Sequence, residues 1–236
     1  MTTLAEQAAA LLDIALSPEQ ETLFDQYAHE LAVWNEHTNL TAIIDPDAVR
    51  LRHFLDSLTV IKAVPMPSGC RVIDVGTGAG FPGLPLRMVC PEIQLTLLEA
   101  TGKKTAFLQH LIDLFGFANV QNVNARAEDA AHDAAHRAAY DVVVARAVAR
   151  LPALIEYLLP FAKVGGVCVA MKGRTAQEEA ADSGHALATL GGRIKSIETF
   201  QLPGVEEPHH LVLIEKIAPT PRDYPRKPGI PTRKPL

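Results

Sequence analysis

The sequence predicts an α/β fold built around a mostly parallel, seven-stranded sheet, and three observations lead to this prediction. From residue 70 onward, short runs rich in β-branched residues alternate with helical stretches, which is typical of βαβ units. The first run, Arg71–Val75, leads directly into a glycine-rich turn. Two final β-like runs, Ile194–Gln201 and His210–Lys216, are joined by a short loop. We therefore expect five parallel strands followed by an antiparallel C-terminal hairpin.

Residues 1–65 are predicted to form a helical N-terminal extension. Ser17 is a typical N-cap, with Pro18 at the first helical position and Gln20 placed to complete a capping box. Asp45-Pro46-Asp47 starts another helix in the same way. The apolar residues that recur at helical spacing behind these two starts are Leu23, Phe24, Tyr27, Leu31 and Trp34, then Leu51, Phe54, Leu55 and Leu58.

Residues 66–218 are expected to form the α/β domain. The other candidate parallel strands are Leu95–Glu99, Val120–Asn124, Val142–Arg146 and Val167–Lys172. Helices are predicted near Pro82–Val89, Lys103–Phe115, Pro152–Phe161 and Gln177–Leu190. A closing hairpin distinguishes the Rossmann-like class I fold of methyltransferases that use S-adenosylmethionine (SAM) from a plain dinucleotide-binding fold. We expect the class I fold.

Residues 219–236 form a tail rich in proline and basic residues. Its prolines, Pro225, Pro228, Pro231 and Pro235, lead us to expect neither a helix nor an inner strand in the last 15 residues. From Arg222 onward the tail carries five cations and one acid. Such a segment suits contact with RNA phosphates, although a solvated tail is an equally good interpretation.

Composition and net charge limit the classes of protein to which this chain can belong. The chain has 236 residues, 48% hydrophobic and 21% charged, as in an ordinary globular protein. We expect no signal peptide and no membrane span, because no basic cluster precedes an apolar run and no stretch of about 20 apolar residues occurs. Three widely spaced cysteines favour neither disulfides nor a metal site, so we expect a cytoplasmic location and no metal. We also expect a monomer. A net charge of −5 means that any RNA contact must rest on a local basic patch.

The glycine-rich turn from Gly76 to Gly83 is the strongest candidate for a cofactor site. Gly78, Gly80 and Gly83 also fit the dinucleotide pattern G-x-G-x-x-G, which alone is weak evidence. Asp74, at the end of the preceding strand, would repel a pyrophosphate but suits a cofactor with an ammonium and a sulfonium. We therefore expect SAM rather than a dinucleotide.

Two further acidic positions fit a nucleoside cofactor. Glu99 ends the next strand, where an acid accepts hydrogen bonds from ribose hydroxyls in both fold families. Ala127-Glu128 follows the third strand, where an adenine is usually held by a backbone amide and an acidic side chain. The same segment also reads as the acidic first turn of a helix.

The residues that would face the methyl acceptor favour a ring nitrogen. No Asn/Asp-Pro-Pro-aromatic loop follows the fourth strand, and Cys90 and Cys168 lie at core-like positions. Guanine N7 has a free lone pair, so its methylation needs alignment rather than a general base. Arg146 is the candidate to position the acceptor or the cofactor carboxylate, with a structural ion pair as the alternative. His53 is assigned no chemical role.

Candidate RNA contacts are the basic residues of the tail and of the strand ends expected to line the site. They are Lys103, Lys104, Lys172, Arg174, Arg222, Arg226, Lys227, Arg233 and Lys234. Any of them can equally be surface charge.

The chain resembles the RsmG/GidB family. The resemblance rests on Asn39-Leu40-Thr41, on His53 to Leu58, on the run from Asp74 to Leu86, on Lys103-Lys104, Arg126-Ala127-Glu128, Arg146 to Ala149 and Met171-Lys172-Gly173, and on the tail from Tyr224 to Pro231. It implies methyl transfer from SAM to N7 of a guanosine in the 530-type loop of 16S rRNA, on naked RNA or the 30S subunit. It also implies SAM contacts at Gly76, Phe81, Ala127, Glu128 and Arg146.

Three other functions remain open from the sequence. The acidic Asp74 argues against an NAD-dependent oxidoreductase. A small-molecule methyltransferase would have no evident use for the basic tail. A non-catalytic RNA-binding factor is opposed by the intact glycine-rich turn.

Overall fold

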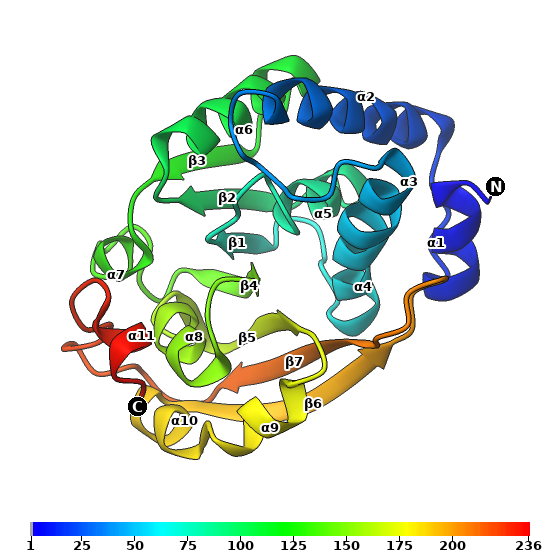
Figure 1. Ribbon diagram of the computed structural model, residues 1–236. Helices are drawn as coiled ribbons and strands as arrows, with labels where there is room; N and C mark the ends of the chain where they lie inside the picture. Colours follow the sequence, from blue (N-terminus) through cyan, green and yellow to red (C-terminus); the bar gives the residue numbers. More distant parts are fainter. Residues whose placement is uncertain (1) are drawn as a thin grey trace.

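The protein is built around one seven-stranded sheet, which the computed structural model shows for a chain described from residue 2 to residue 236 (Figure 1). The strand order is β3-β2-β1-β4-β5-β7-β6. The first five strands are parallel, and β7 runs antiparallel to both β5 and β6. The strands are β1 (Arg71–Val75), β2 (Gln94–Glu99), β3 (Val120–Asn124), β4 (Tyr140–Arg146), β5 (Ala162–Lys172), β6 (Gly192–Phe200) and β7 (His209–Lys216). The predicted parallel sheet with a closing hairpin is confirmed.

Helices cover both faces of this sheet. In chain order they are α1 (Leu4–Leu12), α2 (Pro18–Asn35), α3 (Pro46–Val49), α4 (Asp56–Ala63), α5 (Gly83–Val89), α6 (Gly102–Phe115), α7 (Ala127–Ala130), α8 (Leu151–Leu158), α9 (Ala176–Ala181), α10 (Gly184–Leu190) and α11 (Ile230–Arg233), with a π-helical turn η1 (Arg50–Leu55). The single helix expected over Gln177–Leu190 is two helices. Ser183 donates its hydroxyl to the Glu179 carbonyl at 2.6 Å, and the weak helix former Gly184 follows.

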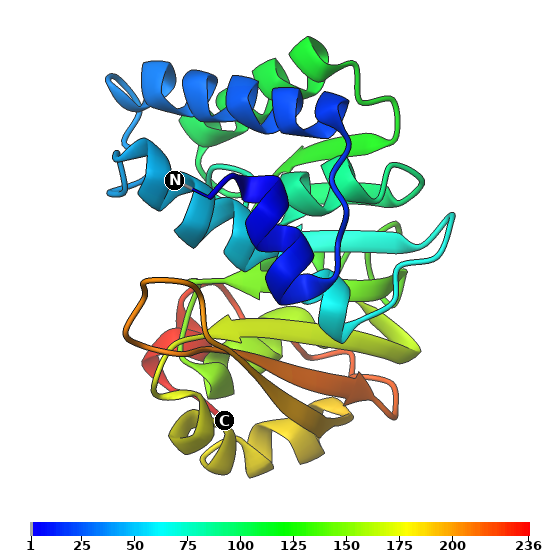
Figure 2. The same ribbon diagram turned by 90° about the vertical axis from the view of Figure 1, so that its right-hand side faces the viewer.

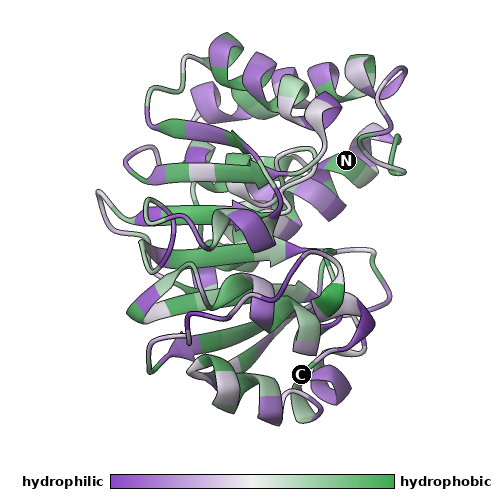
Figure 3. Cartoon of the chain, turned by 90° about the vertical axis from the view of Figure 1, so that its left-hand side faces the viewer, coloured by the Kyte–Doolittle hydropathy of each residue, from purple (hydrophilic) through white to green (hydrophobic). Residues whose placement is uncertain are grey.

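Two hydrophobic clusters form the core, one on each face of the sheet. The first joins Phe24, Leu31 and Phe54 of the N-terminal helices to sheet residues such as Leu97 and Val144. The second joins α8 and α10 to the opposite face and includes Tyr224 and Leu236 of the C-terminal tail (residues 219–236). Figure 2 looks onto the face covered by α1 and α2, and Figure 3 looks onto the other face, where the tail crosses above apolar strands. Residues 1–65 therefore share a core with the sheet.

The N-terminal helices begin at capping boxes. In α2, Ser17 Oγ accepts from Gln20 N, and Gln20 Oε1 accepts from Ser17 N, as the sequence predicts. Thr3 and Glu6 form the same arrangement at α1, which the sequence analysis missed. Tyr27 of α2 then donates its hydroxyl to Ala79 O at 2.5 Å, so the extension supports the glycine-rich turn directly.

The helical run from Pro46 to Ala63 is continuous, with the π-helical turn η1 at its centre. Turns of this kind are rare and often occur at functional sites. This one contains His53 and leads directly into Asp56, and both side chains are buried. Arg146, at the end of β4, contacts both side chains.

The C-terminal tail contains a short helix, so the expectation that its prolines exclude one is wrong for Ile230–Arg233. Pro231 lies in the first turn, where its missing N–H leaves no hydrogen bond unmade. No helix among residues 2–236 is both long enough and apolar enough to cross a membrane.

Candidate functional site

The candidate site lies along the carboxyl ends of β3, β2, β1 and β4. β1 is flanked by β2 on one side and β4 on the other, and the chain leaves these strands toward opposite faces. A crevice at such a switch point is where α/β folds bind ligands. The sequence-predicted residues Gly76, Glu99, Glu128 and Arg146 all follow or end one of these four strands.

The glycine-rich turn has the backbone conformation that requires glycine. Gly76, Gly78 and Gly80 have φ of +70°, +63° and +102°, a region that other residues avoid. A Cβ at Gly80 would meet the Tyr27 hydroxyl and would come within 2.6 Å of Leu84 Cδ1. At Gly78 a Cβ would meet nothing within 4 Å, so this glycine borders open space beside the turn.

Asp74 lies beneath the turn, not at its mouth. The residue is fully buried, and its Oδ2 accepts from Thr77 Oγ1 at 2.6 Å and from Gly83 N at 2.7 Å. Burial raises the pKa of the carboxyl to about 6, although both hydrogen bonds lower it. Asp74 therefore supports the turn from inside and, contrary to expectation, does not present its charge to a cofactor at the mouth of the turn.

Glu99 links the ends of β1 and β2. Its Oε2 accepts from Gly78 N at 3.0 Å, and its Oε1 accepts from Thr101 N at 2.8 Å. An ionised carboxylate can accept about four hydrogen bonds, so capacity remains for the two ribose hydroxyls expected there. The ribose contact of Glu99 stays a prediction.

Ala127 and Glu128 open α7 directly after β3. Ala127 is half-buried, while Glu128 is 6% exposed and its Oε1 accepts from Gly229 N of the C-terminal tail at 3.1 Å. Their predicted adenine contacts stay a prediction, but the arrangement brings the tail to the same carboxylate.

Phe81 lies inside an aromatic stack. Its ring is 5.2 Å from the Tyr27 ring and 4.6 Å from the His53 ring, and the Arg146 guanidinium lies 5.0 Å from its centroid. The side chain is 4% exposed. Phe81 therefore joins α2, η1 and the end of β4 around the turn, and its SAM contact stays a prediction.

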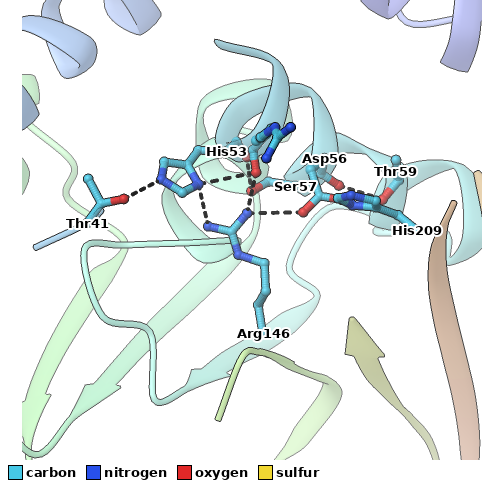
Figure 4. A network of polar contacts seen from close by, with 8 residues as sticks. Thr41, His53, Asp56, Ser57, Thr59, Arg146 and His209 are labelled. Carbon is cyan, nitrogen blue, oxygen red and sulfur yellow. Dashed lines mark hydrogen bonds and ion pairs between the residues drawn. The ribbon is translucent and has the colours of Figure 1, made fainter. Parts of the chain in front are cut away.

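Arg146 is the centre of a buried polar network at the end of β4 (Figure 4). Its Nη1 donates to Asp56 Oδ2 at 3.1 Å and to the Arg52 carbonyl at 3.0 Å. Asp56 Oδ1 in turn forms a hydrogen bond with Nδ1 of His209, on β7, at 2.7 Å. Arg146 thus has the structural ion pair that the sequence left as an alternative, while Nε–H and one Nη2–H have no acceptor among the described residues.

His53 is a neutral member of this network. Burial and the nearby Arg146 charge lower the pKa of His53 to about 4. His53 Nδ1 lies 3.2 Å from Arg146 Nη2, which can only donate, and 3.2 Å from the Arg52 carbonyl, which can only accept, so it satisfies one of these two contacts at a time. The other ring nitrogen, Nε2, lies 2.8 Å from Thr41 Oγ1.

A small cavity of about 140 Å³ borders the network, lined by Asp56, Arg146, Lys172 and His209 among others. A larger cavity, about 610 Å³, lies instead between α2 and the segment leading into α3. It shares Thr41 with the network but no residue of the glycine-rich turn. Within residues 2–236, no group of three or more His, Cys, Asp or Glu side chains is arranged to hold a metal ion.

Comparison with known proteins identifies the family. The model of the GidB family, rRNA small subunit methyltransferase G, matches residues 20–211. The ribosomal RNA small subunit methyltransferase G of Desulforamulus reducens is 41% identical over 236 residues, covering 100% of this chain and 98% of that protein. Its counterpart from Desulfitobacterium hafniense is 46% identical over 225 residues, covering 95% and 93%. The chain belongs to this family.

Solved structures agree with the fold. A SAM-dependent methyltransferase from Aquifex aeolicus matches with a TM-score of 0.53 at 17% identity, covering 72% of this chain and 93% of that one. The TYW2 protein of M. jannaschii, solved in complex with AdoMet, gives the same TM-score over 69% and 77% at 17% identity. The expected class I methyltransferase fold is therefore confirmed.

Two of the predicted RNA contacts of this GidB-family chain are held in ion pairs with buried acids. Lys172 is 10% exposed, and its Nζ pairs with Glu179 at 2.7 Å and donates to Ala149 O at 2.6 Å. Arg226 holds the fully buried Glu156 through Nε and Nη2, at 2.6 to 3.1 Å. Both cations therefore have a structural role, and their contact with RNA stays a prediction.

The other predicted RNA contacts lie at the surface. Arg174 is largely exposed, 3.7 Å from Glu207, and Lys104 is half-buried. Lys103, Arg222, Lys227, Arg233 and Lys234 are exposed. Their contact with RNA stays a prediction.

Three members of the Arg146 network, His53, Asp56 and His209, were not predicted from the sequence as site residues. His53 and Asp56 lie in the stretch that carries the family resemblance, so that stretch was a usable signal. His209 is 153 residues from Asp56, and no local pattern links the two.

Proposed function

We propose that this GidB-family enzyme transfers a methyl group from SAM to N7 of a guanosine in the 530-type loop of 16S rRNA, on the 30S subunit. The family membership supports the reaction class and the ribosomal RNA substrate. A ribosomal substrate also favours a cytoplasmic location. The observation that carries the choice of a ring nitrogen is the Arg146 network, which offers hydrogen-bond donors and no free general base.

The residues along the sheet edge fit SAM. The turn at Gly76 to Gly80 lets backbone approach the methionine part, and Glu99 can accept from the ribose hydroxyls. Glu128 follows β3, on the far side of β2 from the turn, so it can receive the adenine amino group. When bound, SAM supplies a methyl group on a cationic sulfonium.

The charge balance of the network suits a base that becomes positive. Guanine N7 gains a positive charge on methylation, so an unbalanced cation beside it would oppose the reaction. Asp56 balances Arg146, and His53 is neutral because its pKa is about 4. The uncommitted N–H groups of Arg146 can then hold the guanine O6 and align N7 without adding net charge.

Cations near the proposed cofactor site would contact the phosphates of the substrate. Lys103 and Lys104 lie in the first turn of α6, shortly after Glu99, and Arg222, Lys227, Arg233 and Lys234 lie on the tail, whose Gly229 contacts Glu128. These two groups lie near the proposed ribose and adenine positions, where a macromolecular substrate could contact them.

The test is methyl transfer from radiolabelled SAM to 30S subunits that lack the native guanine N7 modification, with the product nucleoside identified by mass spectrometry. We expect 7-methylguanosine in 16S rRNA. A different methylated nucleoside, or no transfer by a chain that binds SAM, would refute the proposed acceptor.

A further inference from the structure

The C-terminal tail is fixed to the protein at several points, which a solvated RNA-binding arm would not need. Arg226 donates from its backbone N to Glu156 Oε1 at 2.7 Å and grips both carboxylate oxygens with its guanidinium. Glu156 is fully buried, so this pair is screened little by solvent. Tyr157 of the same helix bonds Thr232 at 2.8 Å. The tail is therefore anchored to α8, beside which its helix α11 lies in Figure 1.

The segment after α7 holds the tail from the other side. Arg137 donates to the carbonyls of Thr220, Pro221 and Tyr224 at 2.8 to 3.0 Å. His132 Nε2 bonds Pro225 O at 2.9 Å. The tail thus bridges α8 and the α7 segment, which are separate in the chain but adjacent in Figure 1.

Between these anchors, the tail reaches the candidate cofactor site at one atom. Gly229 has φ of +79°, and its N–H donates to Glu128 Oε1 at 3.1 Å. Oε2 of Glu128 has no hydrogen-bond partner among residues 2–236, and Glu128 sits in a helix of only four residues. One oxygen of the carboxylate is thus held by the tail, and the other is left for a ligand.

We propose that the C-terminal tail is a positioning element of the cofactor site: through Gly229 it fixes the Glu128 carboxylate so that Oε2 accepts the adenine N6 amino group. This rests on the proposed function, in which Glu128 receives the adenine. Arg226 and Glu156 act indirectly, by holding the tail in place. Binding at Glu128 and docking of the tail are then coupled, and each stabilises the other by the same factor.

The test compares two ligands that differ only at the adenine. S-adenosylhomocysteine carries the N6 amino group, whereas S-inosylhomocysteine has a carbonyl oxygen there and faces Glu128 with an acceptor. A hydrogen bond to a charged group predicts about 10- to 100-fold tighter binding of the adenosyl ligand by the unaltered protein. In Arg226→Ala we expect this ratio to fall below about 5-fold, measured by calorimetry, because Glu128 loses its orientation.

The matched control is Arg193→Ala, which removes an arginine from the arginine–glutamate pair with Glu215 on the β6–β7 hairpin, 2.7 Å apart. It is expected to keep the full ratio. A folded Arg226→Ala protein that also keeps the full ratio, while losing RNA affinity alone, would overturn the proposal and leave the tail as an RNA contact. Failure of the unaltered protein to bind either ligand would instead refute the proposed cofactor site.

A second measurement needs no substitution, in case Arg226→Ala does not fold. Hydrogen exchange of the unaltered protein is followed over residues 224–233 with each ligand at saturation. We expect S-adenosylhomocysteine to slow exchange there by about 10-fold or more, and S-inosylhomocysteine to have a smaller effect. Equal exchange with and without saturating S-adenosylhomocysteine would overturn the coupling.

Discussion

Asp56→Asn is the substitution that most directly tests the charge balance at the candidate acceptor site. Asp56 is 4% exposed and lies between Arg146, at 3.1 Å, and His209, at 2.7 Å. Asparagine has nearly the same shape and keeps one acceptor oxygen, but it removes the negative charge. Arg146 is then left as a cation beside the base that becomes positive.

The expected magnitude follows from Coulomb's law. Two like charges about 4 Å apart repel by about 1 kcal/mol in water and by about 4 kcal/mol at an effective dielectric constant of about 20. Because the Arg146 side chain is 16% exposed, the repulsion lies between these limits. At 1.36 kcal/mol for each tenfold change in rate, kcat should fall by about 10- to 100-fold. Loss of one partner from a buried ion pair costs about 3–5 kcal/mol of stability, and the retained acceptor should reduce this to about 2–3 kcal/mol.

The assay is single-turnover methyl transfer to 30S subunits, with urea unfolding measured in parallel. Asp141→Asn is the matched control, because Asp141 also pairs with a cation, Lys163 at 3.0 Å, but lies at the start of β4, away from the carboxyl edge. We expect its kcat to stay within about twofold. In the double variant Asp56→Asn, Arg146→Gln the unbalanced charge is gone, so the two effects on kcat should be less than additive.

Two results would refute this reasoning. One is a folded Asp56→Asn protein whose kcat is within twofold of the unaltered protein. The other is full additivity in the double variant, which would mean that Asp56 and Arg146 act independently.

Three further predictions concern the turn, the histidine and the basic residues. Gly78→Arg should abolish SAM binding, measured by calorimetry, because the arginine side chain would occupy the open space beside the turn. The same open space should let the protein stay folded. Unchanged affinity for SAM would refute the site. The pKa of His53 in the folded protein is about 4, below its ordinary value of 6.5, so stability should fall as the pH drops from about 6.5 toward 4. Urea titrations give the difference in unfolding free energy between the unaltered protein and His53→Gln. This difference should change by about 1–2 kcal/mol between pH 7 and pH 5. A difference that does not depend on pH would contradict the lowered pKa of His53. Lys172→Ala should lower stability by about 3 kcal/mol and leave the salt dependence of RNA binding unchanged, whereas Lys227→Ala should reduce the salt slope by about 1 and leave stability unchanged. The reverse pattern in filter binding and unfolding would restore Lys172 as an RNA contact.

The main elements of the fold follow from local sequence patterns. The capping box at Ser17 and Gln20, the β-branched run Arg71–Val75 and the closing hairpin are short-range signals, and each element forms where predicted. Two helices differ from the prediction, because their bounds depend on single residues that a periodic pattern does not weigh. Ser183-Gly184 divides a helix in two, and Pro231 fits the first turn of a short one.

The candidate site was only partly predictable. The glycine-rich turn, Glu99 and Arg146 stand at strand ends, and a parallel sheet brings strand ends to one edge. The direction in which each side chain points could not be predicted from its place on a strand. Asp74 and Arg146 both lie at the carboxyl ends of strands, yet Asp74 is buried beneath the turn and Arg146 contacts Asp56 beside η1.

The sequence by itself determined the class I fold, the place of the glycine-rich turn and the family, because these depend on periodicity, turn chemistry and motif order along the chain. Only the tertiary structure decided the partners of the charged residues. Lys172 and Arg226 look like surface cations in the sequence, but Glu179 and Glu156 are buried beside them. A buried charge is stable only with its partner, and that partner is set by which helices and strands pack together.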